Sequence, residues 1–267
     1  MRYHFISRRA SRAVRLLPLL FGVSLASLST PAAASEGVEL KHVDWSFKAP
    51  FGMFDRAQLK RGLQVYKEVC AACHSIKYVY YRNLAEDGGP ELTEEEVKAI
   101  AADASVMDGP DADGEMFERP AEPKDKFVGP FPNNNAARAA NNGALPPDLS
   151  LMTKARQNGP DYVYSLLTGY GEPPADLELA EGMNYNSYFP GHQIAMPAPL
   201  SDEQVTYEDG TAASVDQMAR DVAAFLTWTA EPKLEDRHRL GFKVMIFLTV
   251  LAGLLFATYK RVWRGRH

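Results

Sequence analysis

Cysteine is scarce in this chain, because only Cys70 and Cys73 occur among its 267 residues. A structural zinc site needs about four ligands, and the sequence has no second Cys-x-x-Cys pair to supply them. A thioredoxin-like redox pair would lie in a strand–helix–strand pattern, and no such pattern surrounds Cys70. Both of these common uses of a Cys-x-x-Cys motif are therefore disfavoured.

The residue after the second cysteine is His74, which completes the motif Cys-Ala-Ala-Cys-His over residues 70–74. This motif is typical of the attachment site for a c-type haem. The two thiols add to the haem vinyl groups, and the imidazole that follows reaches the iron as its proximal ligand. The motif predicts one haem c, bound covalently through Cys70 and Cys73, which leaves no thiol for a disulfide.

Acidic residues are missing from residues 1–34, which contain five arginines. The stretch from Leu16 to Leu28 is apolar, and Ala32, Ala33 and Ala34 provide the small residues of a cleavage site. This order is typical of a secretory signal peptide, removed before Ser35. The alternative, a first transmembrane helix, is disfavoured because the apolar run is short and interrupted.

Long apolar runs are also rare, and residues 244–259 form an apolar run of 16 residues without a charge. A transmembrane helix needs about 20 residues. Extension back to Leu240, with Lys243 reaching the interface, supplies this length. A buried core helix is the alternative, and it is disfavoured by basic residues on both flanks, namely Arg237, His238, Arg239, Lys260, Arg261, Arg264 and Arg266. The predicted order is an exported domain 35–239, a membrane anchor 240–259 and a cytoplasmic basic tail 260–267.

Helical periodicity and capping residues predict a mainly α fold with long coil segments and one C-terminal transmembrane helix. The helices are expected at about 55–69, 94–102, 161–168 and 214–229, and the first and last are expected to cross in the core. The coil is expected at 103–123, 127–150 and 182–200, where prolines, glycines and polar residues are frequent.

Residues 83–127 contain 14 acidic and 4 basic residues, which makes this region strongly negative. One interpretation is a solvated acidic insertion. The other is a docking surface for a basic partner, since a field of one sign steers oppositely charged proteins. Asp111, Asp113 and Gly114 weakly resemble a calcium loop, but the full carboxylate spacing is missing.

The second axial ligand of the iron decides the chemistry, because an open haem face binds oxygen or peroxide whereas two strong ligands suit electron transfer. The side chains that qualify are His42, His192, His238, Met53, Met107, Met116, Met152, Met183, Met196 and Met218. Met218 lies on the apolar face of a predicted helix, where packing in the core is expected. Met196 lies in a coil held by prolines, which favours it modestly over Met183 and His192. A thioether favours reduced iron and raises the redox potential.

Four stretches resemble the cytochrome c1 family, the haem subunit of the cytochrome bc1 complex. They are residues 69–75 (VCAACHS), 136–150 (AARAANNGALPPDLS), 161–170 (DYVYSLLTGY) and 188–196 (YFPGHQIAM), and the C-terminal anchor matches as well. The resemblance covers nearly all of the chain after residue 34, and it implies a cytochrome c-like haem domain.

By this resemblance Met196 is the distal iron ligand opposite His74. Arg156 and Tyr162 match residues near the haem propionates, where a cation offsets the carboxylate charge. Asn141 and Pro146 match the coil of the haem pocket. Some bacterial relatives have an extra cysteine pair, which this chain lacks, so another interaction must hold the loop around Met196.

The implied function is single-electron transfer from the Rieske iron–sulfur protein to a soluble basic cytochrome c. The chain is then not an enzyme by itself, and it works beside cytochrome b in a dimeric complex, in a bacterial inner membrane with its haem domain in the periplasm. No nucleic-acid partner is expected. The alternatives are a free-standing membrane-anchored cytochrome c shuttle and a haem enzyme or sensor with an open site.

Overall fold

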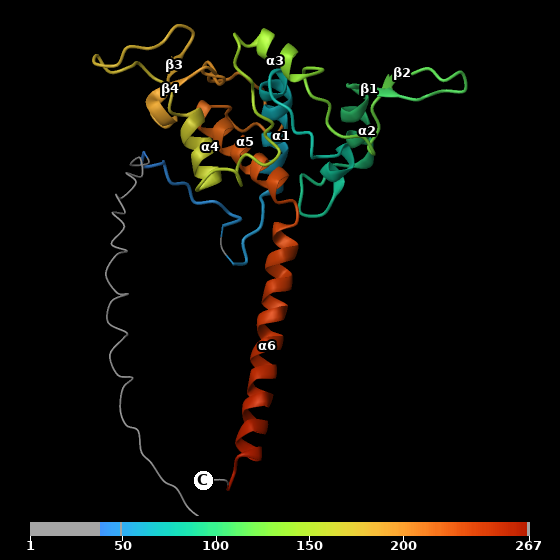
Figure 1. Ribbon diagram of the computed structural model, residues 1–267, viewed down its shortest axis with the longest axis vertical. Helices are drawn as coiled ribbons and strands as arrows, with labels where there is room; N and C mark the ends of the chain where they lie inside the picture. The colour runs from blue at the N-terminus through green and yellow to red at the C-terminus, as the bar shows by residue number, and fades with distance from the viewer. Residues whose placement is uncertain (1–37, 49, 266–267) are drawn as a thin grey trace, which may run out of the picture. The chain divides into compact units, whose positions relative to one another are not determined.

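The computed structural model describes residues 38–48 and 50–265, and its elements are mainly helical with little sheet, as the sequence predicts (Figure 1). The predicted signal peptide lies outside these residues. The helices are α1 (Arg56–Glu68), α2 (Glu94–Ala102), α3 (Asn134–Ala140), α4 (Gly159–Leu167), α5 (Val215–Ala230) and α6 (Leu234–Val262), with short 3-10 turns at Cys70–Ala72, Tyr81–Ala85 and Pro190–His192. The strands form two antiparallel pairs, β1 (Ser105–Asp108) with β2 (Phe117–Pro120) and β3 (Asn184–Tyr185) with β4 (Gln193–Ile194).

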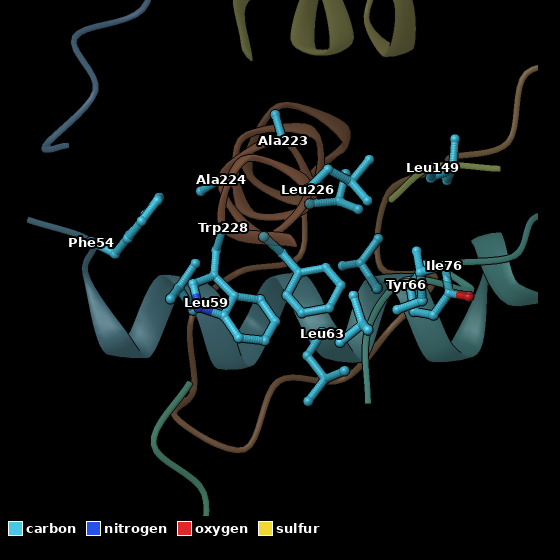
Figure 2. Packing of buried hydrophobic residues seen from close by; sticks show 14 of the residues in the cluster. Phe54, Leu59, Leu63, Tyr66, Ile76, Leu149, Ala223, Ala224, Leu226 and Trp228 are labelled. Carbon is cyan, nitrogen blue, oxygen red and sulfur yellow. The ribbon is translucent and has the colours of Figure 1, made fainter. Parts of the chain in front are cut away.

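The core lies where α5 packs against α1 and α4. Figure 2 shows Leu59, Leu63 and Tyr66 of α1 on one side and Leu226 and Trp228 of α5 on the other. All five side chains are buried. Full burial of a large apolar side chain contributes about 1.5–3 kcal/mol, so this interface provides much of the apolar stabilisation behind the predicted haem motif.

Side-chain caps begin three of the helices that the sequence predicts, namely α1, α2 and α5. The Asp55 carboxylate accepts hydrogen bonds from the first turn of α1, and Thr93 and Glu96 form a reciprocal capping box at α2. Ser214 accepts a hydrogen bond from Gln217 N at the start of α5. Because such caps pair backbone donors that the helix leaves unsatisfied, local sequence is enough to define these starts.

The prediction of an uninterrupted coil over residues 127–150 is wrong, because α3 lies within it. The prolines of this stretch fall at its two ends, which leaves a proline-free segment rich in alanine between them. Alanine has the highest intrinsic helix propensity. The Asn133 side chain accepts a hydrogen bond from Ala136 N at 3.0 Å and caps the new helix.

The prediction of a surface loop over residues 103–123 is also wrong, since β1 and β2 pair there, with Val106 opposite Arg119. The Asp111 carboxylate closes the connecting turn by accepting hydrogen bonds from Asp113 N at 2.9 Å and Glu115 N at 3.0 Å. In the part of the chain that the structure describes, no cluster of three or more metal-ligating side chains occurs. The Asp111 turn is therefore an element of the hairpin rather than a calcium loop.

The acidic region 83–127 is partly packed rather than wholly solvated. Leu84, Val97 and Ala101 are buried in the core, and α2 lies against the 3-10 turn at Tyr81–Ala85. The acidic side chains of α2 and of the β1–β2 hairpin face solvent. The region therefore has an apolar base and a negatively charged outer surface.

The C-terminal helix α6 begins at Leu234, before the predicted anchor, and contains the whole of residues 240–259. Its most apolar stretch has a mean hydropathy of 2.2 and buries none of its residues within the chain. A helix that is apolar on all sides and unburied fits a bilayer rather than a protein core. α6 continues past the other helices as one unbroken element (Figure 1).

Candidate haem site

The predicted haem-attachment motif lies immediately after α1, on the 3-10 turn Cys70–Ala72. The carbonyl oxygen of Cys70 accepts hydrogen bonds from Cys73 N at 3.1 Å and from His74 N at 2.8 Å. This turn brings both sulfur atoms and the imidazole to the end of one helix. Burial, together with the neighbouring Cys73, raises the pKa of Cys70 to about 12, and neither thiol forms a disulfide within the described residues.

The His74 imidazole is held by a segment 73 residues further along the chain. Its Nδ1 lies 2.8 Å from the carbonyl oxygen of Pro147. A carbonyl only accepts hydrogen bonds, so Nδ1 carries the proton and Nε2 keeps its lone pair. Burial lowers the pKa of His74 in spite of this hydrogen bond and the charge of Asp148. The ring is therefore neutral at pH 7, which is the form that binds a metal.

The segment that carries Pro147 is fixed by Asp148. One carboxylate oxygen of Asp148 accepts hydrogen bonds from Ser75 Oγ at 2.7 Å and from Lys77 N at 2.9 Å. Leu149 N donates to Ser75 O at 2.8 Å, so two coil segments lie side by side here. Pro146, one of the predicted pocket residues, is half-buried directly before this segment.

Asn141, the other predicted residue of the pocket coil, ends α3. Its side-chain Nδ2 donates to Ala137 O at 2.7 Å, and its backbone carbonyl accepts a hydrogen bond from Ala144 N. These two hydrogen bonds close the helix and begin the turn toward Pro146. The structure therefore gives Asn141 a positioning role in the coil that carries Pro146 and Pro147.

Met196 follows a short hairpin, in which β3 pairs with β4 and Asn184 lies opposite Ile194. The connection between the strands is held by Asn186, which is fully buried. Its Nδ2 donates to Leu166 O at 2.8 Å, and its Oδ1 accepts from Tyr188 N at 3.0 Å. Asn186 therefore connects this loop to the end of α4.

Tyr170 connects the Met196 loop to the end of α4. Its hydroxyl donates to Met196 O at 3.1 Å. Burial raises the pKa of Tyr170, and nearby Tyr162 raises it further. The Arg156 guanidinium lies 5.7 Å from the centre of the Tyr162 ring, a cation–π contact. The structure therefore brings together Arg156 and Tyr162, the two residues predicted to lie near the propionates, and Tyr170 ties that region to Met196.

Several of the other proposed iron ligands have roles elsewhere. Met218 is fully buried in the core, as its periodicity predicts, and Met152 packs against the core. His42 Nδ1 lies 3.3 Å from an Asp161 carboxylate oxygen, and His238 Nδ1 lies 3.2 Å from Gly52 O.

Met183 and His192 lie in the same loop region as Met196. His192 has a φ of 59°, and its Nδ1 is buried without a hydrogen-bond partner among the described residues. The Met196 carbonyl accepts a hydrogen bond from the Tyr170 hydroxyl, and the His192 carbonyl accepts one from Asn186 N.

The sequence did not indicate three residues that hold the backbone beside His74 and Met196, namely Asp148, Tyr170 and Asn186. The Pro-Asp-Leu-Ser sequence carries a local signal for Asp148, because an aspartate side chain often accepts a hydrogen bond from the backbone two residues later. Asp148 does so with Ser150 N at 3.0 Å. Asn186 and Tyr170 act over longer distances, and no local pattern indicates them.

The site fits a covalently attached haem. It has two thiols without a disulfide, a neutral imidazole whose Nε2 keeps its lone pair, and a thioether in a loop that hydrogen bonds hold in place. The fold and this donor set define a c-type cytochrome with a membrane-spanning helix.

Residues 45–266 match the model of the Cytochrome C1 family. Cytochrome c1 of Rhodospirillum rubrum is 49% identical over 91% of this chain and 94% of its own length, and a mitochondrial cytochrome c1 heme protein of Arabidopsis thaliana is 51% identical over 94% and 82%. A cytochrome b/c1 of Bradyrhizobium diazoefficiens is 53% identical over 84% of this chain, which spans only 35% of that longer protein. The chain belongs to the cytochrome c1 family.

Members of this family are the haem-bearing electron-transfer subunits of the bc1 complex, which also contains cytochrome b and the Rieske protein. The chain is accordingly a membrane-anchored subunit that carries a covalently bound haem c, and it is not an enzyme by itself.

Proposed function

We propose that this chain accepts single electrons from the Rieske iron–sulfur protein and passes them to a soluble basic cytochrome c. Cys70 and Cys73 would hold the haem, and His74 and Met196 would supply the ligands of its iron. The bound haem supplies an iron that changes reversibly between two oxidation states. The observation that carries this proposal is the hydrogen bond from His74 Nδ1 to Pro147 O, because it orients the ring and leaves Nε2 for the metal.

The protein residues control what the iron can do. With His74 and Met196 both bound, the iron would have no open position for oxygen or peroxide, and the thioether would favour the reduced state. Arg156 and Tyr162 sit together, so a guanidinium and a phenol are available to the haem propionates. A cation beside these carboxylates stabilises their charged form and raises the redox potential further. Asn141 and Pro146 shape the coil on the His74 side of the pocket.

The proposed placement follows from the two apolar segments. Residues 1–34 are a signal peptide, so residues 35–239 form a periplasmic domain above a bacterial inner membrane. Residues 240–259 cross the membrane, and residues 260–267 are a cytoplasmic basic tail. The chain works in a dimeric complex. Purification in mild detergent tests this placement, because a free-standing shuttle would purify without cytochrome b and the Rieske protein.

The experiment that tests the ligand assignment replaces Met196 by leucine. We expect the midpoint potential to fall by on the order of 0.1 V or more, since axial ligation controls a range of about 0.8 V. The iron should also begin to bind carbon monoxide, because one axial position becomes open. Redox titration and visible spectroscopy of the intact complex measure both effects.

The matched control is Met183→Leu, which changes the same residue type in the same loop region and should leave the potential unchanged. If Met196→Leu keeps the wild-type potential while Met183→Leu lowers it, the assignment moves to Met183. An unchanged potential in both variants removes methionine ligation from this loop.

A further inference from the structure

A loop of the haem domain lies against the start of the membrane-spanning helix and presents apolar side chains outward. In residues 50–53, Phe51 is 71% exposed and Met53 is 58% exposed. Large apolar side chains exposed to this degree mark a contact with a partner or a membrane when they are grouped. The loop makes no use of these two side chains in the core, so their exposure needs another explanation.

The loop is held rigidly against α6. The Phe51 ring packs edge-on against Phe242, with ring centroids 5.4 Å apart. The His238 Nδ1 donates to Gly52 O at 3.2 Å. A Cβ atom at Gly52 would lie 2.5 Å from the Phe47 carbonyl carbon, so the backbone packs too closely for any other residue. The backbone beside Phe51 is therefore fixed by the fold, and the ring itself contacts Phe242.

A second set of contacts fixes the chain just after the loop. The Glu235 carboxylate, in the first turn of α6, accepts hydrogen bonds from Phe54 N at 2.8 Å and from both terminal nitrogens of Arg56 at 2.7 and 2.9 Å. This carboxylate is nearly buried. The loop, the start of α1 and the start of α6 consequently behave as one unit.

The depth of the loop follows from helix geometry. Phe242 lies two residues beyond Leu240, the first residue of the proposed span, and a helix rises 1.5 Å per residue. The ring that contacts Phe242 is therefore at the level of the first turn of the span. Phenylalanine and other large apolar side chains at this level are buried at the boundary between headgroups and acyl chains. The apolar face of Phe51 is also continuous with Met245, which lines the same cavity beside α6.

We propose that residues 50–53 form a second membrane contact, in which Phe51 and Met53 insert into the interfacial lipid that surrounds α6. Arg237 also lines the cavity between the loop and the helix and lies where lipid phosphates are expected, although it pairs with Glu231 within the chain. A single helix leaves the domain free to tilt about its anchor. A second contact, rigidly joined to α1, fixes the orientation of the domain that carries the haem motif. This inference rests on the proposed span and deepens the placement given above.

The test measures the surroundings of Phe51 in the intact complex in native lipid vesicles. A nitroxide spin label is attached at Phe51→Cys, and its relaxation is measured with oxygen, which concentrates in lipid, and with a water-soluble nickel chelate. The matched control is Met107→Cys on strand β1, where the native side chain is 60% exposed. The complex without an added cysteine, labelled in the same way, corrects for cysteines of the other subunits.

We expect the ratio of oxygen to nickel enhancement to be several-fold higher at position 51 than at position 107. Equal ratios would place the loop in water and overturn the proposal. Low accessibility to both reagents at position 51 would mean that another subunit covers it, which also overturns the proposal. Met53→Cys provides a second reading if the first variant does not assemble.

This outcome is separable from the electron-transfer proposal. Met196→Leu should lower the redox potential and leave the lipid exposure of a label at position 51 unchanged. The Phe51→Cys complex should keep the wild-type redox potential. A failure of one proposal therefore leaves the other standing.

Discussion

The buried carboxylate of Asp161 joins the N-terminal arm to the helix that carries Tyr162. Trp45 Nε1 donates to it at 2.6 Å, Lys48 Nζ at 2.7 Å and Val43 N at 3.3 Å. These donors, together with His42 Nδ1 at 3.3 Å from the same carboxylate, hold residues 42–48 against the first turn of α4. This arrangement explains why Trp45 is buried although the residues around it are polar.

The pH dependence of stability at Asp161 follows from these hydrogen bonds. Burial alone would raise the pKa of Asp161, but the hydrogen bonds from Lys48 and Trp45 outweigh it and hold the pKa below its ordinary value. A carboxylate with a lowered pKa contributes stability that is fully present above the pKa of the unfolded chain, about 3.9. That contribution is lost as the pH falls through the lower pKa of the folded state.

We expect Asp161→Asn to lower the free energy of unfolding by about 1–3 kcal/mol near pH 7, since buried donors lose a charged acceptor. The midpoint of guanidinium unfolding, followed through the haem absorbance from about pH 8 to pH 3, measures the effect. The difference from wild type should stay constant down to about pH 5 and shrink below about pH 4. A difference that grows toward acid pH would contradict this account.

The crossing of α1 and α5 depends on Gly62. A Cβ at this position would lie 2.2 Å from Asp221 O and 2.6 Å from Phe225 Cβ. The sequence shows Gly62 only as a weakness of the helix, because glycine disfavours helical structure. The structure shows that this glycine allows the two helices to approach closely enough to bury Leu59 and Leu63 against α5 (Figure 2).

Gly62→Ala should therefore destabilise the protein, although alanine is the better helix former. Forcing extra atoms into a packed interface costs about 1–3 kcal/mol, and the close contacts here involve backbone that cannot move easily. The control is Gly171→Ala, where a Cβ meets nothing within 4 Å and no strained φ occurs. Guanidinium unfolding midpoints should fall for Gly62→Ala and stay at the wild-type value for Gly171→Ala. A stabilised Gly62→Ala variant would mean that helix propensity outweighs packing at this crossing.

The whole molecule carries an uneven charge distribution. The acidic side chains of residues 83–127 differ in what they do: Asp108 and Asp125 pair with Arg119 and stabilise the hairpin. Glu95 and Glu118 are exposed and occur in none of the ion pairs that we identify in the described residues. Some acidic residues therefore stabilise the fold, whereas others contribute only to the electrostatic field around the protein.

Reversing Glu95, Asp113 and Glu118 to lysine should slow electron transfer to a basic cytochrome c and flatten its salt dependence. Steering by a charged surface changes association rates by about 10–10³-fold, and salt screens it over about 10 Å at 0.1 M. Stopped-flow rates at several ionic strengths measure the effect. Neutralising the same three residues to glutamine or asparagine should give an intermediate rate. Unchanged rates in both variants would leave this region as a solvated insertion without a docking role.

The features that were predictable from the sequence are those set by neighbouring residues. The attachment motif of residues 70–74 consists of residues that are adjacent in the sequence. The caps at Asp55, Thr93 and Ser214 act within one helical turn. The membrane helix depends only on the length and composition of an apolar run. Each of these features needs no knowledge of what lies elsewhere in the chain.

The helix α3 and the hairpin of β1 and β2 were missed for different reasons. Four prolines near α3 suggested coil throughout, although they bound a proline-free segment. The hairpin depends on pairing between Val106 and Arg119 across a turn, and composition alone cannot reveal such a register.

The hydrogen bonds that position the residues around the haem motif depend on the tertiary structure. Spacing favoured Met196 only modestly over Met183 and His192, since it does not measure distance in space, and the assignment of Met196 came from the resemblance to the family. Folding brings Pro147 to the ring of His74 and Tyr170 to the carbonyl of Met196, across 73 and 26 residues. Hydrogen bonds between such distant segments form only once the core has packed, so no local pattern in the chain can specify them.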